Sequence, residues 1–113
     1  MSSGILKIYS STTDTVGGEL LYERIVYLAK NKGISGVTVF RGIMGYGMSS
    51  ANISSAKFWE LTEKLPVVIE IIDETGKLEE FYSMIEPELK GMKKGCLVSM
   101  EQVDIKLQKP GRI

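Results

Sequence analysis

The hydrophobic positions of the chain change period several times, and its first half predicts a strand, a helix and a second strand. Residues 5–9 are mostly apolar, which is typical of a buried strand, and the polar residues 10–15 predict a loop. A helix is expected from Glu19, whose charge complements the positive end of a helix dipole, as far as Gly33, a typical helix stop. Its apolar side chains recur at helical spacing and are Leu21, Ile25, Leu28 and Ala29. Strand-forming side chains follow in residues 37–40.

The second half predicts a strand, a helix and a final strand. Pro66 introduces the apolar residues 67–72, and proline is tolerated as the first residue of a strand. A helix from about Gly76 has one apolar face, made of Leu78, Phe81, Tyr82, Ile85 and Leu89. Because proline lacks a backbone donor, Pro87 predicts a kink or a break in this helix. The complete order of elements is therefore β-α-β-β-α-β.

The final strand is expected to begin after Gly95. Its apolar positions change parity between residues 98–100 and residues 103–107, which predicts a bulge or a second short strand. Cys96 is expected to be a small buried residue of this strand.

Residues 42–56 form an unusual segment between the second and third strands. They contain three glycines, four serines and no charged side chain. Fixing the backbone of each residue costs about 1–2 kcal/mol, and so small and polar a segment buries little apolar area in return. We therefore expect a long flexible loop at about residues 45–57. The strands on either side belong to one core, which favours a functional loop over a linker.

The composition indicates a single domain over residues 1–113 and narrows the function. Fourteen basic and fourteen acidic residues cancel, which argues against a polybasic surface for nucleic acid. The absence of histidine and the single cysteine exclude the usual zinc site within one chain, and Ser-His or Cys-His catalysis. No signal-peptide pattern or long apolar run is present, so we expect a soluble, cytoplasmic protein without membrane insertion.

Both faces of the predicted sheet carry apolar side chains. Residues 67, 69 and 71 point to one face, while residues 68 and 72 point to the other. Two helices cover one face of a four-stranded sheet, and an exposed apolar patch on the other needs a partner. The pattern predicts at least an oligomer.

Two local features leave two interpretations open. Gly42, Gly45 and Gly47 could let backbone amides approach a phosphate, or they could simply form the twisted turn at the end of a strand. Arg41 could pair with a carboxylate or phosphate of a ligand through its planar fork, or it could form a structural ion pair within the chain or between subunits, for example with Glu70 or Asp73.

Short sequence motifs around the second and third predicted strands resemble those of the PII family of signalling proteins. The first combines a glycine and a Thr-Val pair with a Gly-aromatic-Gly turn, as in Gly36-Val37-Thr38-Val39 and Gly45-Tyr46-Gly47. The second is Leu-Pro-Val-Val-Ile-Glu-Ile at residues 65–71. Residues 39–47 and 65–70 resemble more closely still the PII-like family called domain of unknown function 190. The resemblance covers residues 6–106.

This resemblance implies an α+β, ferredoxin-like (PII-like) sandwich with a four-stranded antiparallel sheet and two helices on one face. It also implies a homotrimer with a nucleotide in the cleft between neighbouring subunits. The ligand positions that it implies are Gly36, Val37, Thr38, Gly45, Tyr46, Gly47, Lys93, Lys94 and Gly95. It also makes Lys106 and Lys109 further candidates, in addition to Arg41. The PII turn before the last strand reads Gly-x-Gly-Lys, whereas this chain has Met-Lys-Lys-Gly-Cys at residues 92–96.

The expected function is that of a non-enzymatic, PII-like trimeric sensor. An adenine nucleotide (ATP, ADP or AMP) would bind between subunits, and residues 45–57 would contact and regulate a partner protein. Neither catalytic nor metal-ligating residues are expected. Two alternatives remain: a small ferredoxin-like enzyme with a carboxylate or a tyrosine as acid or base, and a cation-linked trimer resembling CutA proteins.

Overall fold

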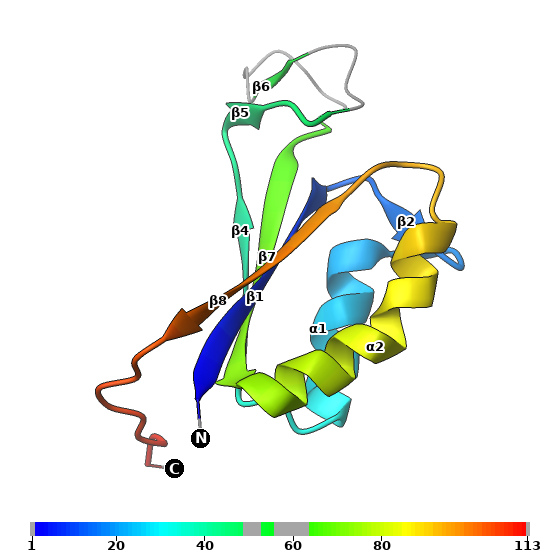
Figure 1. Ribbon diagram of the computed structural model, residues 1–113. Coiled ribbons are helices and arrows are strands. Elements are labelled where there is room, and N and C mark those ends of the chain that lie inside the picture. Colours follow the sequence, from blue (N-terminus) through cyan, green and yellow to red (C-terminus); the bar gives the residue numbers. More distant parts are fainter. Residues whose placement is uncertain (1, 49–52, 56–63, 113) are drawn as a thin grey trace.

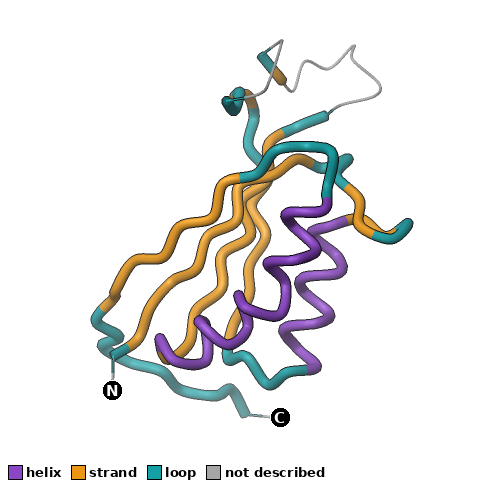
Figure 2. Tube along the Cα trace, turned by 45° about the vertical axis from the view of Figure 1, so that its right-hand side comes forward, coloured by secondary structure: helices purple, strands orange, loops and turns teal. Residues whose placement is uncertain are grey.

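A four-stranded antiparallel sheet with two helices on one face forms the body of the protein (Figures 1 and 2). The computed structural model describes residues 2–48, 53–55 and 64–112. The sheet has the spatial order β4-β7-β1-β8, made of β1 (Ser3–Ser11), β4 (Gly36–Arg41), β7 (Pro66–Glu74) and β8 (Leu97–Val103). The helices are α1 (Leu21–Asn31) and α2 (Thr75–Gly91). Short ladders join β2 (Thr15–Val16) to β3 (Glu19–Leu20) and β5 (Met44–Gly45) to β6 (Ser54–Ser55). The α+β, ferredoxin-like prediction is confirmed.

The core lies between the sheet and the helices, because alternate strand positions point toward them. Along β7 the buried positions alternate with half-buried ones from Pro66 to Glu74, which is the period-2 pattern of a strand with two different faces. The buried side chains come from both central strands and both helices, and include Leu6, Ile8, Ile69, Ile71, Leu21, Ile25, Phe81 and Ile85.

The opposite face of the sheet, which we call the open face, has no helix over it (Figure 2). Direct cross-strand pairs place three rows of side chains on it. The first row is Phe40, Val68, Tyr9 and Leu97; the second is Thr38, Glu70, Lys7 and Ser99; the third is Gly36, Ile72, Ile5 and Glu101. Two rows are largely apolar, and Phe40 and Leu97 are about half exposed.

Of the kink or break predicted at Pro87, the break is wrong, because helix α2 continues through this residue. An internal proline costs about 3 kcal/mol. Ile85 and Leu89 flank Pro87 and are both buried in the core, and burying one such side chain contributes about 1.5–3 kcal/mol. Packing therefore overrides the local preference.

The bulge or second strand predicted near residue 103 is also absent from the described part of the chain. Strand β8 pairs with β1 in unbroken register from Leu97 opposite Tyr9 to Val103 opposite Ser3. Val98 and Met100 pack toward the helices, whereas Val103 lies on the open face. The apolar positions move from the face covered by the helices to the open face, while the strand itself stays regular.

The connection between β1 and α1 contains a hairpin where the sequence predicted a loop and a helix start at Glu19. Thr15 pairs with Leu20 and Val16 with Glu19, and α1 begins only at Leu21. Gly17 and Gly18 have φ of 58° and 84°. Two consecutive positive φ angles are what a two-residue type I′ hairpin turn requires, and glycine adopts them without strain.

A buried carboxylate ties the start of α2 to the connection between α1 and β4. Asp73 accepts hydrogen bonds from the amides of Ser35 at 2.9 Å and Glu74 at 2.6 Å, and Lys77 Nζ lies 3.3 Å away. Burial by itself raises the pKa of Asp73, but the two amides and the ammonium group outweigh it, so the pKa lies below its usual value.

We therefore expect Asp73→Asn to lower the free energy of unfolding at pH 7 by about 1–3 kcal/mol, since one amide would face a donor instead of an acceptor. The folded-state pKa is lower than the unfolded one, so the charged form stabilises the protein above the unfolded pKa of about 4. This contribution disappears as the pH falls through the folded-state pKa. Urea unfolding of both proteins between pH 7 and pH 2.5 measures it.

Glu80→Gln, on the exposed side of α2, is the matched control and should change stability by less than about 0.5 kcal/mol. An Asp73→Asn deficit that stays constant over the whole pH range would contradict the assignment.

Candidate functional site

The predicted ligand residues lie in three separate places of one chain. Residues 36–38 begin β4, and residues 45–47 lie beyond the other end of that strand. Residues 93–95 connect α2 to β8, near the same end of the sheet as residues 45–47 but at its opposite edge. The edge strands are separated by three spacings of about 4.8 Å, or about 14 Å in all. A single chain does not bring the three groups together.

Gly42 has a structural reason to be glycine. A Cβ there would lie 2.8 Å from Cγ of Pro66, which real Cβ atoms do not tolerate. Its amide donates a hydrogen bond to the carbonyl oxygen of Pro66 at 2.7 Å, so it is already used by the fold. A Cβ at Gly45 would lie 3.5 Å from Cγ of Pro66, which is an ordinary contact. The turn interpretation therefore holds for Gly42, and both interpretations stay open for Gly45.

Arg41 is exposed at the end of β4 and forms no ion pair with any residue that the structure describes. Of its two expected structural partners, Asp73 pairs with Lys77 instead, and Glu70 lies on the open face opposite Thr38. The intrachain ion pair predicted for Arg41 is thus not found among the described residues.

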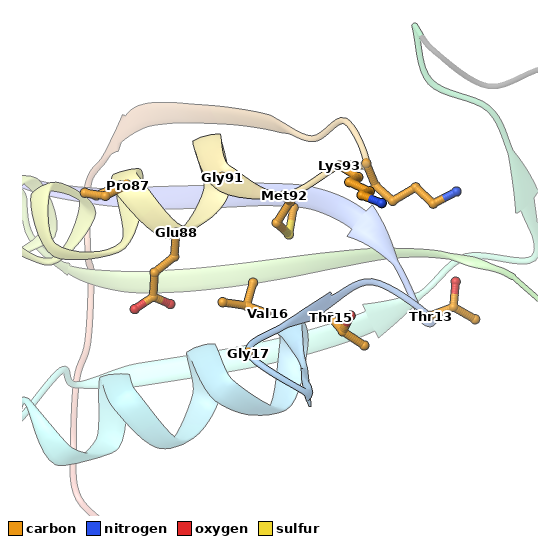
Figure 3. A pocket seen from close by; sticks show the side chains of 10 residues that line it. Thr13, Thr15, Val16, Gly17, Pro87, Glu88, Gly91, Met92 and Lys93 are labelled. Carbon is orange, nitrogen blue, oxygen red and sulfur yellow. The ribbon is translucent and has the colours of Figure 1, made fainter.

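A surface hollow lies between the β2–β3 hairpin and the C-terminal end of α2 (Figure 3). It has a volume of about 510 Å³, within the range of small-molecule pockets. Its lining residues are Thr13, Thr15, Val16, Gly17, Pro87, Glu88, Gly91, Met92, Lys93 and Lys94. The pocket joins two predicted ligand residues, Lys93 and Lys94, to a hairpin that the sequence interpretation did not connect with them.

The charged side chains of this pocket differ in whether they form ion pairs with other described residues. Glu88 accepts two hydrogen bonds of 2.6 Å from Nε and Nη2 of Arg24, which also reaches Glu19. The hydrogen bond from Arg24 holds the pKa of Glu88 below its usual value, so this carboxylate stays ionised and is a poor proton donor. Lys93 and Lys94 form no ion pair within the described residues. The lysine end of the pocket therefore favours an anion.

The hairpin wall of the pocket could have been found from the sequence. Thr-Val-Gly-Gly-Glu-Leu at residues 15–20 has two glycines between short strand-forming pairs, a known signal for a two-residue hairpin. The pairs are too short to show a period, so the hydrophobic pattern predicts a loop closed by Gly17 and Gly18 and a helix from Glu19 instead.

A second, smaller hollow of about 340 Å³ shares Met92 and Lys94 with the first. Cys96 lines it and is exposed, ahead of the first residue of β8, so its prediction as a buried strand residue is wrong. Partial burial, with a smaller contribution from nearby Asp14, raises the pKa of the thiol. Cys96 is therefore mostly protonated at neutral pH.

The root of the long loop carries large exposed apolar side chains. Ile43 and Tyr46 are each 76% exposed, and Met48 is fully exposed. Met44 pairs with Ser55 and Gly45 with Ser54. Most of the loop expected at residues 45–57, including residues 49–52 and 56–57, lies outside the described residues.

Two kinds of feature are absent from the described ranges, 2–48, 53–55 and 64–112. No group of three or more His, Cys, Asp or Glu side chains there could hold a metal ion. None of the helices there is long and apolar enough to cross a membrane.

Comparison with known proteins identifies the family. Residues 3–105 match the DUF190 family, described as uncharacterized ACR, COG1993. A UPF0166 protein of Aquifex aeolicus is 38% identical over 101 residues, covering 89% of this chain and 90% of that protein. The UPF0166 protein MJ1524 of Methanocaldococcus jannaschii is 40% identical over 85 residues, covering 75% and 73%. The chain belongs to the DUF190/UPF0166 family.

Solved structures with the same fold are PII-like proteins. CPII from Thiomonas intermedia K12, bound to ADP, AMP and bicarbonate, has a TM-score of 0.62 and 15% identity, covering 91% of this chain and 89% of that one. The GlnK–ATP complex of B. subtilis has a TM-score of 0.58 and 14% identity, covering 90% and 82%. The fold is therefore PII-like, as the sequence motifs predicted.

The raised pKa of Cys96 predicts slow alkylation despite its exposure. A higher pKa lowers the thiolate fraction at pH 7, and the thiolate is the reacting form. We expect iodoacetamide to modify the native protein more slowly than the urea-unfolded protein at pH 7, with the difference between the two rates narrowing as the pH rises through the pKa of the thiol in the folded protein. Because Cys96 is the one cysteine of the sequence, intact-mass spectrometry measures this directly. Equal rates in both states at pH 7 would contradict the shift.

Proposed function

We propose that this protein is a non-enzymatic, PII-like homotrimeric sensor that binds an adenine nucleotide in clefts between its subunits. The observation that carries the proposal is the separation of residues 36–38 and 45–47 from residues 93–95 in one chain. A site that uses them together needs a second copy. The fold supports the nucleotide, since CPII bound to ADP and AMP and the GlnK–ATP complex share it.

The open face supports assembly. Its first row, from Phe40 across Val68 and Tyr9 to Leu97, is apolar across all four strands. Soluble monomers rarely leave so continuous an apolar surface in water. Packing of three open faces against one another would cover it and would bring the edge strands of neighbouring subunits together.

Lys93 and Lys94 would supply the charge for the phosphates. They lie in the short connection after α2, and no described carboxylate neutralises them. Thr38 on the open face and the Gly45 amide would then come from a neighbouring subunit or from the loop root. The hydroxyl of Thr38 and the backbone of Gly45 carry no charge. They therefore suit the sugar and base of a nucleotide better than its phosphates.

The exposed side chains of Ile43, Tyr46 and Met48 support a contact with a partner protein. Aromatic residues and methionine are enriched at protein interfaces. In the proposed mechanism, a nucleotide bound at the root of this loop changes how these side chains are presented to the partner.

The proposed trimer predicts a mass in solution of three times the 12.5-kDa chain. Phe40→Asp should convert it to monomers, because an unpaired buried charge at the interface is strongly disfavoured. Tyr27→Asp is the matched control, since Tyr27 is 74% exposed on α1 and away from the open face. Light scattering at micromolar concentration measures all three proteins, and a monomeric wild type would refute the assembly.

Loss of both lysines should weaken nucleotide binding. Charge-assisted contacts contribute about 1.5–3 kcal/mol, so Lys93→Ala/Lys94→Ala should raise the Kd for ATP or ADP about ten- to a hundredfold. Lys30→Ala/Lys32→Ala removes the same charge from the end of α1 and should leave the Kd unchanged. Calorimetric titration compares the three proteins. Equal affinities would leave the lysines without a ligand role, and no binding to the wild type would refute the nucleotide.

A further inference from the structure

The pocket between the β2–β3 hairpin and the C-terminal end of α2 carries charges of opposite sign toward its two ends. Figure 3 shows Glu88 toward one end of the row of lining side chains and Lys93 toward the other, with Val16 and Met92 between them. Lys94, which follows Lys93 in the chain, also lines the pocket. All of these residues belong to one chain, so the pocket does not depend on a neighbouring copy.

The Glu88 end keeps a net negative charge although Arg24 contacts it. Arg24 donates one hydrogen bond of 2.6 Å to each oxygen of Glu88 and another of 3.1 Å to Glu19. Two carboxylates and one guanidinium group together carry one negative charge. A carboxylate has about four acceptor positions, so Glu88 can accept from a further donor. Its side chain is 28% exposed, which leaves it accessible from the pocket.

The backbone of α2 strengthens the negative end of the pocket. The helix ends at Gly91, and the C-terminal end of a helix carries the negative end of its dipole and carbonyl groups without partners inside the helix. Apart from its own turn of helix and its chain neighbours, no described residue lies within 4 Å of the position that a Cβ of Gly91 would take. A ligand can therefore approach this end of the helix.

The other end of the pocket is positive. Lys93 and Lys94 form no ion pair with the residues that the structure describes, and the other candidate lysines, Lys106 and Lys109, do not line this pocket. The Cα atoms of Glu88 and Lys93 are separated by one helical turn and a short connection, which is at most about 12 Å. The walls between the two ends carry no charge and are made of Thr13, Thr15, Val16, Pro87 and Met92.

We propose that this pocket binds a small zwitterion, an ω-amino acid whose amine and carboxylate lie at opposite ends of a short apolar chain. The amine would lie against Glu88 and the end of α2, and the carboxylate against Lys93 and Lys94. A simple anion would use the lysines alone and would leave the negative end of the pocket without a counter-charge. This inference goes beyond the proposed function and does not rest on it, because one chain supplies the whole site.

Titration of the full chain with compounds that differ in charge tests the site. 6-Aminohexanoate carries both charges, hexanoate carries only the acid, and 1-aminohexane carries only the amine. Amide chemical shifts in nuclear magnetic resonance spectra follow each titration at low ionic strength, where charges are least screened. We expect 6-aminohexanoate to bind about tenfold or more tightly than either other compound. The largest shifts are expected at Gly17, Gly91 and Lys93, which line the pocket.

Substitutions at the two ends should have opposite selectivity. Glu88→Gln should weaken 6-aminohexanoate and 1-aminohexane about tenfold and leave hexanoate unchanged or tighter. Lys93→Ala/Lys94→Ala should weaken 6-aminohexanoate and hexanoate about tenfold and leave 1-aminohexane unchanged. Lys30→Ala/Lys32→Ala, at the end of α1, is the matched control and should bind all three compounds as the wild type does. A pocket that merely lost its shape would lose all three compounds together.

Glu19→Gln gives a second measurement in case Glu88→Gln does not fold. It leaves the pair of Arg24 and Glu88 in place but removes the net negative charge, so it should also weaken the two compounds that carry an amine. Glu80→Gln, on the exposed side of α2, is its matched control and should have no effect. Thermal unfolding establishes which variants fold.

The outcomes separate this inference from the proposed function. Equal affinities for the three compounds, no saturable shift with 6-aminohexanoate, or shifts confined to other parts of the chain overturn the zwitterion site and leave the sensor proposal standing. Phe40→Asp should still bind 6-aminohexanoate, because the site lies within one chain, and loss of this binding also overturns the inference. A wild type that binds 6-aminohexanoate but no nucleotide supports the site and refutes the nucleotide.

Discussion

The four-stranded sheet of this protein has two faces, and the two helices cover only one of them. Alternation along β1 and β7 sends half of their side chains into a core with α1 and α2, and the other half to the open face. The apolar rows there, which include Phe40 and Tyr9, have no cover within the described chain. Because hydrophobic burial is the main stabilising contribution in folding, this imbalance favours the proposed assembly. The predicted ligand residues, which one chain keeps apart, would meet only in such an assembly.

The elements with a strong hydrophobic period could be predicted from the sequence, because the spacing of apolar residues within each of them is that of a helix or of a strand. The stripe on α1 and the alternation of β7 identify helix and strand without knowledge of neighbours. The β2–β3 hairpin could not be found by period, since its strands have two residues each. Local preference failed at Pro87, where packing decides, and at β8, where the parity change is a move of the apolar positions from the covered face to the open face of one regular strand.

The candidate site was predictable in parts and not as a whole. The motifs at residues 36–38 and 45–47 contain glycines that would let a ligand approach the backbone closely. Lys93 and Lys94 are recognisable as charges at the end of a helix. Whether such groups meet depends on how copies pack, which no local pattern encodes. The Arg24–Glu88 pair, which holds α1 to the end of α2, is likewise a contact between distant side chains and leaves no sequence signal.

The topology also has a consequence for how the chain folds as it is synthesised. Strand β1 emerges first, yet both of its ladder partners, β7 and β8, come from the second half of the chain. A ribosome adds about 5–20 residues per second, so β1 waits several seconds for its second neighbour. Pairings between segments so far apart in sequence also slow the folding step itself. During that delay β1 lacks both of the strands that pair with it in the folded sheet.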